Sequence, residues 1–150
     1  MKLENEYQLQ VAVVEYIRTN HPNALLTASL GELQTTVPKR IQSYKKGYLS
    51  GSPDLKIENL HTKYSGFVIE LKSPSGKGRL SDKQRNVLAL YALNNFKCLV
   101  SNNYYEITQK IDDYMKDVRI KCELCNNNKQ FFKNMISLNS HIKHFHNQEQ

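Results

Sequence analysis

The segment Phe67–Ser73 reads FVIELKS, and its charge pattern decides how the rest of the chain is interpreted. Because side chains alternate between the two faces of a strand, three large apolar residues share one face, while Glu70 and Lys72 share the other with Val68. Burying charged groups without partners is unfavourable. The segment is therefore either an edge strand with a solvated face or a strand that presents a charged pair for a function.

A second alternating segment precedes this one. Asp54–Leu60 (DLKIENL) is separated from it by the polar turn HTKYSG, and the pattern predicts a hairpin or two neighbouring strands. In a hairpin, Asp54 comes near Glu70 at one end. The two carboxylates and the backbone carbonyl of Leu71 would offer the oxygen ligands that Mg²⁺ or Mn²⁺ takes. Lys72 beside them could orient an attacking water or neutralise charge on a phosphate.

The remaining elements are predicted from periodicity and end signals. Helical spacing of apolar residues predicts helices over residues 3–18, 80–95 and 104–118, with Ser81 as an N-cap. Short strands are expected at residues 24–28 and 96–101, the latter with Cys98 as a buried residue. This mixture predicts an α/β domain with a central mixed sheet flanked by helices.

Residues 31–53 are basic and poor in apolar periodicity, which predicts a long loop. Its segment PKRIQSYKKGY carries four cations with two tyrosines between them, a composition that suits phosphates and exposed bases. A solvated charged loop is the alternative. The expected basic rim comprises Lys39, Arg40, Lys45 and Lys46 from this segment, together with Lys77, Arg79 and Lys83.

The composition of the chain limits the classes of protein to which it can belong. The chain has 150 residues, 39% of them hydrophobic, and a formal net charge of +7. A core can form, and the charge favours a polyanionic partner, with nucleic acid ahead of an anionic membrane surface. No apolar run is long enough for a membrane span. The segment MKLENEYQLQ lacks the apolar stretch of a signal peptide, so we expect an intracellular protein of the cytoplasm or nucleus.

Several of these motifs occur together in one known family. The sequence GSPDL…FVIELKSPSGKGRLSDKQRNVL resembles the virus-type replication–repair nuclease (VRR-NUC) family of the PD-(D/E)xK nuclease superfamily. The matching features are the PD pair ending at Asp54, the ELK triplet from Glu70 to Lys72, and the LSxxQ pattern that ends at Gln84. An amino-terminal helix with Glu6 is also similar, and the resemblance covers roughly residues 4–102.

The resemblance implies a restriction-endonuclease-like core and assigns roles to individual residues. Asp54 and Glu70 would be ligands of Mg²⁺ or Mn²⁺, and Lys72 the catalytic lysine. Gln84 would position the lysine or the phosphate. Glu6, paired on its helix face with Gln10, would be a further acidic member.

Other interpretations of single residues remain open. Glu15 on the same helix competes with Glu6, and Glu6 could instead be a solvated helix residue.

The activity implied is metal-dependent hydrolysis of DNA phosphodiesters. Branched DNA of the Holliday-junction or flap type, in viral or phage replication, recombination or repair, is the leading substrate hypothesis, with a homodimer matching a two-fold junction. One rival hypothesis is a non-catalytic DNA-binding protein with a zinc finger on a nuclease scaffold. Another is a sequence-specific restriction-type endonuclease.

The composition changes after Val118, which predicts a nuclease domain over residues 1–118 and a second domain over residues 119–150. The sequence CELC, with Cys122 and Cys125, precedes a histidine cluster and resembles a C₂H₂ zinc finger. The resemblance implies a structural Zn²⁺ held by both cysteines with His141 and His146, with His144 as an alternative to His146. A longer gap, NNNKQ, departs from the pattern. We expect this finger to dock on DNA without reading its bases.

Overall fold

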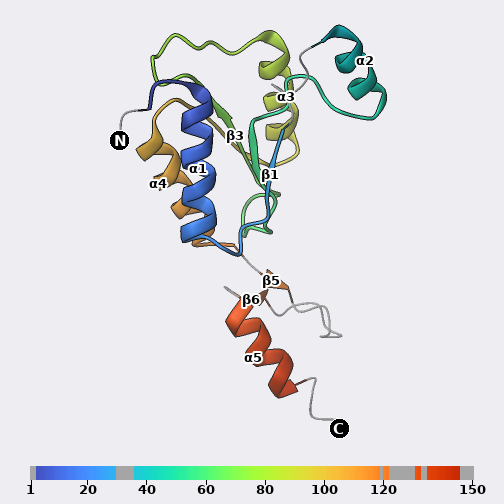
Figure 1. Ribbon diagram of the computed structural model, residues 1–150. Helices are drawn as coiled ribbons and strands as arrows, with labels where there is room; N and C mark the ends of the chain where they lie inside the picture. Colours follow the sequence, from blue (N-terminus) through green and yellow to red (C-terminus); the bar gives the residue numbers. More distant parts are fainter. Residues whose placement is uncertain (1–2, 30–35, 119, 122–130, 133–134, 146–150) are drawn as a thin grey trace.

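The computed structural model describes residues 3–29, 36–118, 120–121, 131–132 and 135–145, with side chains described for residues 3–29, 36–118 and 137–143. Its main element is a four-stranded mixed sheet in the order β1-β2-β3-β4 (Figure 1). The strands β1, β2 and β3 pair antiparallel, and β4 joins β3 in parallel. Their bounds are Leu26–Ala28, Leu55–Ile57, Phe67–Leu71 and Lys97–Ser101. The α/β class, the mixed sheet and the β2–β3 hairpin agree with the sequence analysis.

Two helices cover one face of this sheet. The α1 helix (Glu6–Asn20) and the α4 helix (Tyr104–Met115) lie side by side in Figure 1 and bury one shared core with the strands. The predicted apolar stripe of α1 supplies Leu9, Val13 and Ile17 to this core. The apolar face of β3 meets it, since all five residues of that strand are buried. Removing each large aliphatic side chain from water contributes about 1.5–3 kcal/mol.

The α3 helix (Asp82–Leu93) covers the opposite face and connects β3 to β4. Its start forms a complete capping box, because the Ser81 hydroxyl accepts the Gln84 backbone N–H and the Gln84 side chain accepts the Ser81 backbone N–H. The predicted N-cap is thus confirmed. This cap fixes Gln84 in the first turn of α3, which faces the side of β3 that carries the charged pair.

The expectation of a loop over residues 31–53 is wrong for its middle part. Residues Val37–Lys45 form the α2 helix, which begins after Thr36 with Pro38 in its first turn. Proline is favoured there because its fixed φ suits a helix and its missing N–H would be unpaired anyway. No residue of α2 is buried. Val37, Ile41 and Tyr44 lie at helical spacing but are exposed, and this short stripe stands among basic and polar residues.

Cys98 is also placed differently from the expectation. It is exposed and not buried. Among the described strands β4 pairs with β3 alone, which places it at the edge of the sheet. Its thiol contacts the backbone carbonyls of Leu88 and Phe96.

The carboxy-terminal part contains two short strands and a helix. The strands β5 (Ile120–Lys121) and β6 (Phe131–Phe132) pair antiparallel, and α5 (Met135–Phe145) contacts both. Val118, just before β5, still belongs to the main core and forms a bridge with His61. The boundary at residue 118 stays a prediction. In the part of the chain that is described, no helix is long and apolar enough to cross a membrane.

Candidate active site

The β2–β3 hairpin brings two carboxylates to one end of the sheet. Leu55 pairs with Ile69, so Asp54 lies opposite Glu70 one step further along the ladder. The Asp54 carboxylate also accepts the backbone N–H of Leu71 at 2.7 Å. Its position is therefore fixed by the backbone of the strand that carries Glu70.

Gly51 brings the segment before Asp54 onto the start of α3. A Cβ atom at Gly51 would lie 2.8 Å from the carbonyl carbon of Lys83 and 3.0 Å from the backbone nitrogen of Gln84. The residue also adopts a φ of +86°, which only glycine takes readily. The sequence motif GSPD indicates a sharp bend at Gly51 and Pro53, but it does not indicate the contact of Gly51 with α3.

Glu70 is the centre of the site and is only 1% exposed. Its Oε1 accepts a hydrogen bond from the Lys72 ammonium at 2.6 Å and a second, very short one from the Gln84 side-chain amide. Its Oε2 is buried and has no hydrogen-bond partner among the described residues. Oε1 thus accepts two hydrogen bonds, which fix the orientation of the carboxylate. Oε2 can accept a further ligand.

The surroundings of Glu70 hold its pKa far above the usual range. Burial raises the pKa of the Glu70 carboxyl to about 7, although the hydrogen bond from Lys72 lowers it. The negative charges of Asp54 and Glu6 raise it further. Strongly perturbed carboxyl groups of this kind are typical of functional sites. A cation close to these three carboxylates would relieve the repulsion among them.

The donor set suits a hard divalent cation. Carboxylate oxygens are the ligands that Mg²⁺ prefers, and the partnerless Oε2 of Glu70 is such an oxygen. Within the described residues, no three Cys, His, Asp or Glu side chains form a complete metal cage. Mg²⁺ does not require one, because it usually keeps several waters and binds one or two carboxylates plus substrate phosphate.

Glu6 is favoured over Glu15 as the additional acidic residue. Glu6 is the first residue of α1, is half-buried, and contributes to the pKa of Glu70. Glu15 lies further along the same helix and is exposed. Gln10 is half-buried on the same helix face as Glu6.

The position of Lys72 is restricted along its whole length. Its backbone N–H donates to the carbonyl of Ser101 on β4 at 2.9 Å, and its side chain is 12% exposed. A Cβ atom at Gly78 would lie 3.1 Å from Cδ of Lys72, so the glycine loop after β3 lies directly on the lysine stem. These contacts direct the Lys72 ammonium at the Glu70 carboxylate.

Comparison with known proteins identifies the family of the chain. The sequence matches the model of the VRR-NUC domain over residues 1–102. The chain belongs to the VRR-NUC family. A solved structure described as "VRR_NUC domain protein" has 18% sequence identity and a TM-score of 0.61, with 77% of this chain and 91% of that chain covered. That likeness shows the same fold. No curated protein matches the chain.

Family membership makes the domain a nuclease domain, as the sequence motifs predicted. The match ends at residue 102, one residue after β4. It therefore includes the whole sheet, α3 and all the residues that surround Glu70. The α4 helix and the carboxy-terminal elements lie outside the matched range.

All seven residues of the predicted basic rim are exposed, but they come from three elements. Four belong to α2 or its carboxy-terminal cap, and Lys77 and Arg79 lie on the loop before α3. Lys83 is in the first turn of α3, where its backbone contacts Gly51.

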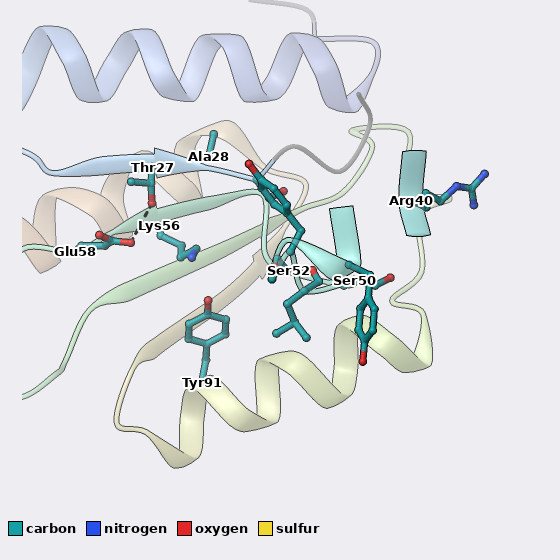
Figure 2. Close-up of a pocket in the computed structure, with 14 residues that line it drawn as sticks. Thr27, Ala28, Arg40, Ser50, Ser52, Lys56, Glu58 and Tyr91 are labelled. Carbon is teal, nitrogen blue, oxygen red and sulfur yellow. Dashed lines mark hydrogen bonds between the residues drawn. The ribbon is translucent and has the colours of Figure 1, made fainter. Parts of the chain in front are cut away.

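A cavity of about 720 Å³ lies beside the site, between α2, the α2–β2 connection, the strands β1 and β2, and α3 (Figure 2). Sequence reasoning predicted part of its lining, Arg40, Tyr44 and Tyr48, as a nucleic-acid surface. It missed Lys56, Glu58 and Tyr91, which give no local signal because they come from separate elements.

The predicted zinc ligands Cys122, Cys125 and His146 lie outside the described residues, and the side chain of His144 is not described either. His141 on α5 is buried, as is Leu138 one turn before it. The order of the elements here is strand, strand, helix.

Proposed function

We propose that this chain is a metal-dependent endonuclease that hydrolyses DNA phosphodiesters. The observation that carries the proposal is the burial and the hydrogen bonding of the Glu70 carboxylate. Its carboxylate is buried beside Asp54, one oxygen is bound by Lys72 and Gln84, and the other has no partner among the described side chains and backbone groups. Such an arrangement is unfavourable for the protein alone and becomes favourable when a cation and a phosphate complete it.

The chain's own residues would divide the work as follows. Asp54 and Glu70, with the backbone carbonyl of Leu71, would hold Mg²⁺ or Mn²⁺, and Glu6 would add negative charge nearby. When bound, the cation would supply charge neutralisation at the scissile phosphate and a more acidic water. Lys72 would stabilise the negative charge that develops on the phosphate. Gln84 would keep Glu70 in one rotamer.

Branched DNA of the Holliday-junction or flap type is the proposed substrate. Support comes from the net charge of +7 and from the exposed rim, whose cations come from α2, the loop before α3 and α3 itself. Non-parallel duplex arms around one scissile phosphate would use cations on several sides. A homodimer in viral or phage replication, recombination or repair, inside the cell, fits this substrate because a two-fold enzyme matches a two-fold junction.

For the carboxy-terminal part we propose a structural Zn²⁺ site formed by Cys122, Cys125, His141 and His146. The strand–strand–helix order and the burial of His141 support it. A unit this small folds only when a metal or disulfide supplements its core. Its proposed role is docking on DNA without base reading, since one finger buries little DNA surface.

A cleavage assay tests the nuclease proposal. The full chain is incubated with Mg²⁺, Mn²⁺ or EDTA on a four-way junction, a flap, single-stranded DNA and linear duplex. We expect divalent-dependent cutting of the branched substrates, lost in Glu70→Ala and kept in Asp113→Ala, an exposed carboxylate on α4. Absence of cutting on every substrate would support the non-catalytic rival. Cutting of linear duplex at one fixed sequence would support the restriction-type rival.

A further inference from the structure

We infer that the cavity between α2 and α3 binds one unpaired nucleotide of the DNA substrate, with its base stacked on tyrosine. This inference adds a specificity site to the proposed nuclease function. The cavity's volume of about 720 Å³ falls within the range of small-molecule pockets, roughly 300–1,000 Å³. It is large enough for a base with its sugar and phosphate and too small for a duplex.

Aromatic rings give the cavity the capacity to stack a base. Tyr44, Tyr48 and Tyr91 all line it. Tyr91 rises from α3 toward the sheet in Figure 2 and packs edge-on against Phe96 at a centroid distance of 5.0 Å. The Lys56 ammonium lies 5.7 Å from the centre of the Tyr91 ring. Tyr91 is therefore held in place before any ligand arrives, which lowers the entropy lost on binding.

The polar groups of the cavity favour one orientation of a bound nucleotide. Arg40 stands at one side in Figure 2, and Thr27 and Glu58 stand at the other. The Thr27 hydroxyl donates to the Glu58 carboxylate at 3.2 Å. A phosphate would be repelled by Glu58 and attracted by Arg40, whereas Glu58 can accept hydrogen bonds from the amino groups of bases. The base therefore belongs at the Glu58 side, and the phosphate at the outer edge on the Arg40 side, where the guanidinium points away from the other labelled residues in Figure 2.

The cavity and the carboxylates share one face of the sheet. Lys56 pairs with Val68, and two residues along each strand, on the same face, lie Asp54 and Glu70. On α3, Tyr91 follows Gln84 by two helical turns, which places them about 10 Å apart. A few nucleotides of one strand span this distance. A strand whose phosphate reaches Glu70 can thus place a neighbouring base in the cavity.

An unpaired base enters such a recess more easily than a paired one. A base inside a duplex must first be unstacked and unpaired, whereas a flap or a junction branch point offers a base that is already free. The cavity would therefore favour branched over linear DNA without reading a sequence.

Binding without hydrolysis tests the inference. The full chain, with its zinc kept, is titrated in buffer without Mg²⁺ or Mn²⁺ with a flap that carries 2-aminopurine in its unpaired arm and with a blunt duplex of equal length. Fluorescence anisotropy reports affinity, and 2-aminopurine emission reports stacking. We expect tighter binding of the flap and quenching of the 2-aminopurine. Tyr91→Ala and Tyr44→Ala should each weaken flap binding about ten-fold or more, with duplex binding unchanged and Tyr91→Phe close to the wild type.

Tyr105→Ala is the matched control, because Tyr105 lies on α4 outside the cavity and is 74% exposed, as Tyr44 is 72% exposed. Tyr44 is on the surface, so its replacement keeps the fold even if Tyr91→Ala does not. The inference would be overturned if flap binding and quenching stayed unchanged in Tyr44→Ala and did not differ between Tyr91→Ala and Tyr91→Phe. An equal loss in Tyr105→Ala would overturn it as well. Because hydrolysis needs added Mg²⁺ or Mn²⁺, a protein that stacks the base but cuts nothing when these cations are supplied would contradict only the nuclease proposal.

Discussion

The Gln84 side chain connects the first turn of α3 to the Glu70 carboxylate in the sheet. Its carbonyl oxygen accepts the backbone N–H of Ser81, and its amide donates to Oε1 of Glu70. Because the capping box orients Gln84, the start of the helix and the rotamer of Glu70 are set together. The oxygen that Gln84 and Lys72 do not bind is thereby directed into the site.

We expect Gln84→Ala to reduce divalent-dependent cleavage by about 10- to 100-fold, the effect typical of losing a partner that orients a metal ligand. The measurement is single-turnover cleavage at several Mg²⁺ concentrations, which separates weaker metal binding from slower chemistry. Ser81→Ala is the matched control. It removes the hydroxyl cap, which is worth about 0.5–2 kcal/mol of stability, but keeps the backbone N–H that Gln84 accepts. Equal loss of cleavage in both variants would contradict a positioning role for Gln84.

The raised pKa of Glu70 predicts a specific dependence of stability on pH in the absence of metal. In the folded state the carboxyl keeps its proton up to about pH 7, whereas in the unfolded state it loses it near the ordinary value of 4.5. Its contribution to the free energy of unfolding is thus fully present below pH 4.5 and is lost as pH rises through 7. At about 1.4 kcal/mol per pKa unit, the loss is on the order of 3 kcal/mol.

Glu70→Gln should therefore raise the Tm of the metal-free protein at pH 8 and change it little at pH 4.5. Thermal unfolding at the two pH values, in buffer without Mg²⁺ or Mn²⁺ and with the zinc kept, measures this. Adding Mg²⁺ at pH 8 should raise the Tm of the wild type, because binding to the folded state alone stabilises it, and should not do so in Glu70→Gln. The control is Asp113→Asn, since Asp113 is exposed and its ion pair with Lys116 lowers its pKa. A lower Tm for Glu70→Gln at pH 8 would contradict the assignment.

Gly51→Ala tests the close contact between the GSPD segment and α3. The new Cβ would overlap the backbone of Lys83 and Gln84, which cannot rotate away. We expect a loss of roughly 1–3 kcal/mol in stability together with reduced cleavage, because Asp54 and Gln84 are displaced from each other. Gly47→Ala is the control for backbone strain alone, since Gly47 has a φ of +91° and no atom within 4 Å of its added Cβ. Circular dichroism melts of both variants should show the larger loss for Gly51→Ala.

The sequence predicted the parts of the molecule that depend on local patterns. Alternation at Glu70 and Lys72, the Ser81 cap and the stripe of Leu9, Val13 and Ile17 all follow from neighbours in the chain, and all appear in the structure. The approach of Asp54 to Glu70 at one end of the sheet follows from the hairpin register. The charged pair is therefore not on a solvated strand face, because Glu70 is buried under α3.

What the sequence missed depends on contacts between distant segments. The α2 helix has only a short apolar stripe, Val37, Ile41 and Tyr44, within a basic segment, and it buries none of these residues. Gly51 matters because of the backbone at Lys83, which lies far along the chain. Tyr91 has no distinguishing signal within its helix, but its ring lines a cavity whose other walls come from β1, β2 and α2. Such sites become visible only when the fold places the segments together.

Cys122→Ser tests the proposed zinc site at the carboxy terminus. Removing one of four ligands should reduce bound zinc from one equivalent per chain toward none, because three ligands hold the metal far more weakly in a unit that folds only with it. The measurement is zinc content by elemental analysis after gel filtration of the full chain. The matched control is Cys98→Ser, which replaces an exposed thiol on β4 in the nuclease domain and should keep the zinc. Full zinc retention in Cys122→Ser, or equal loss in both variants, would contradict the assigned ligands. Cys98 is exposed, so the unfolding transition of the nuclease domain should stay unchanged in Cys98→Ser.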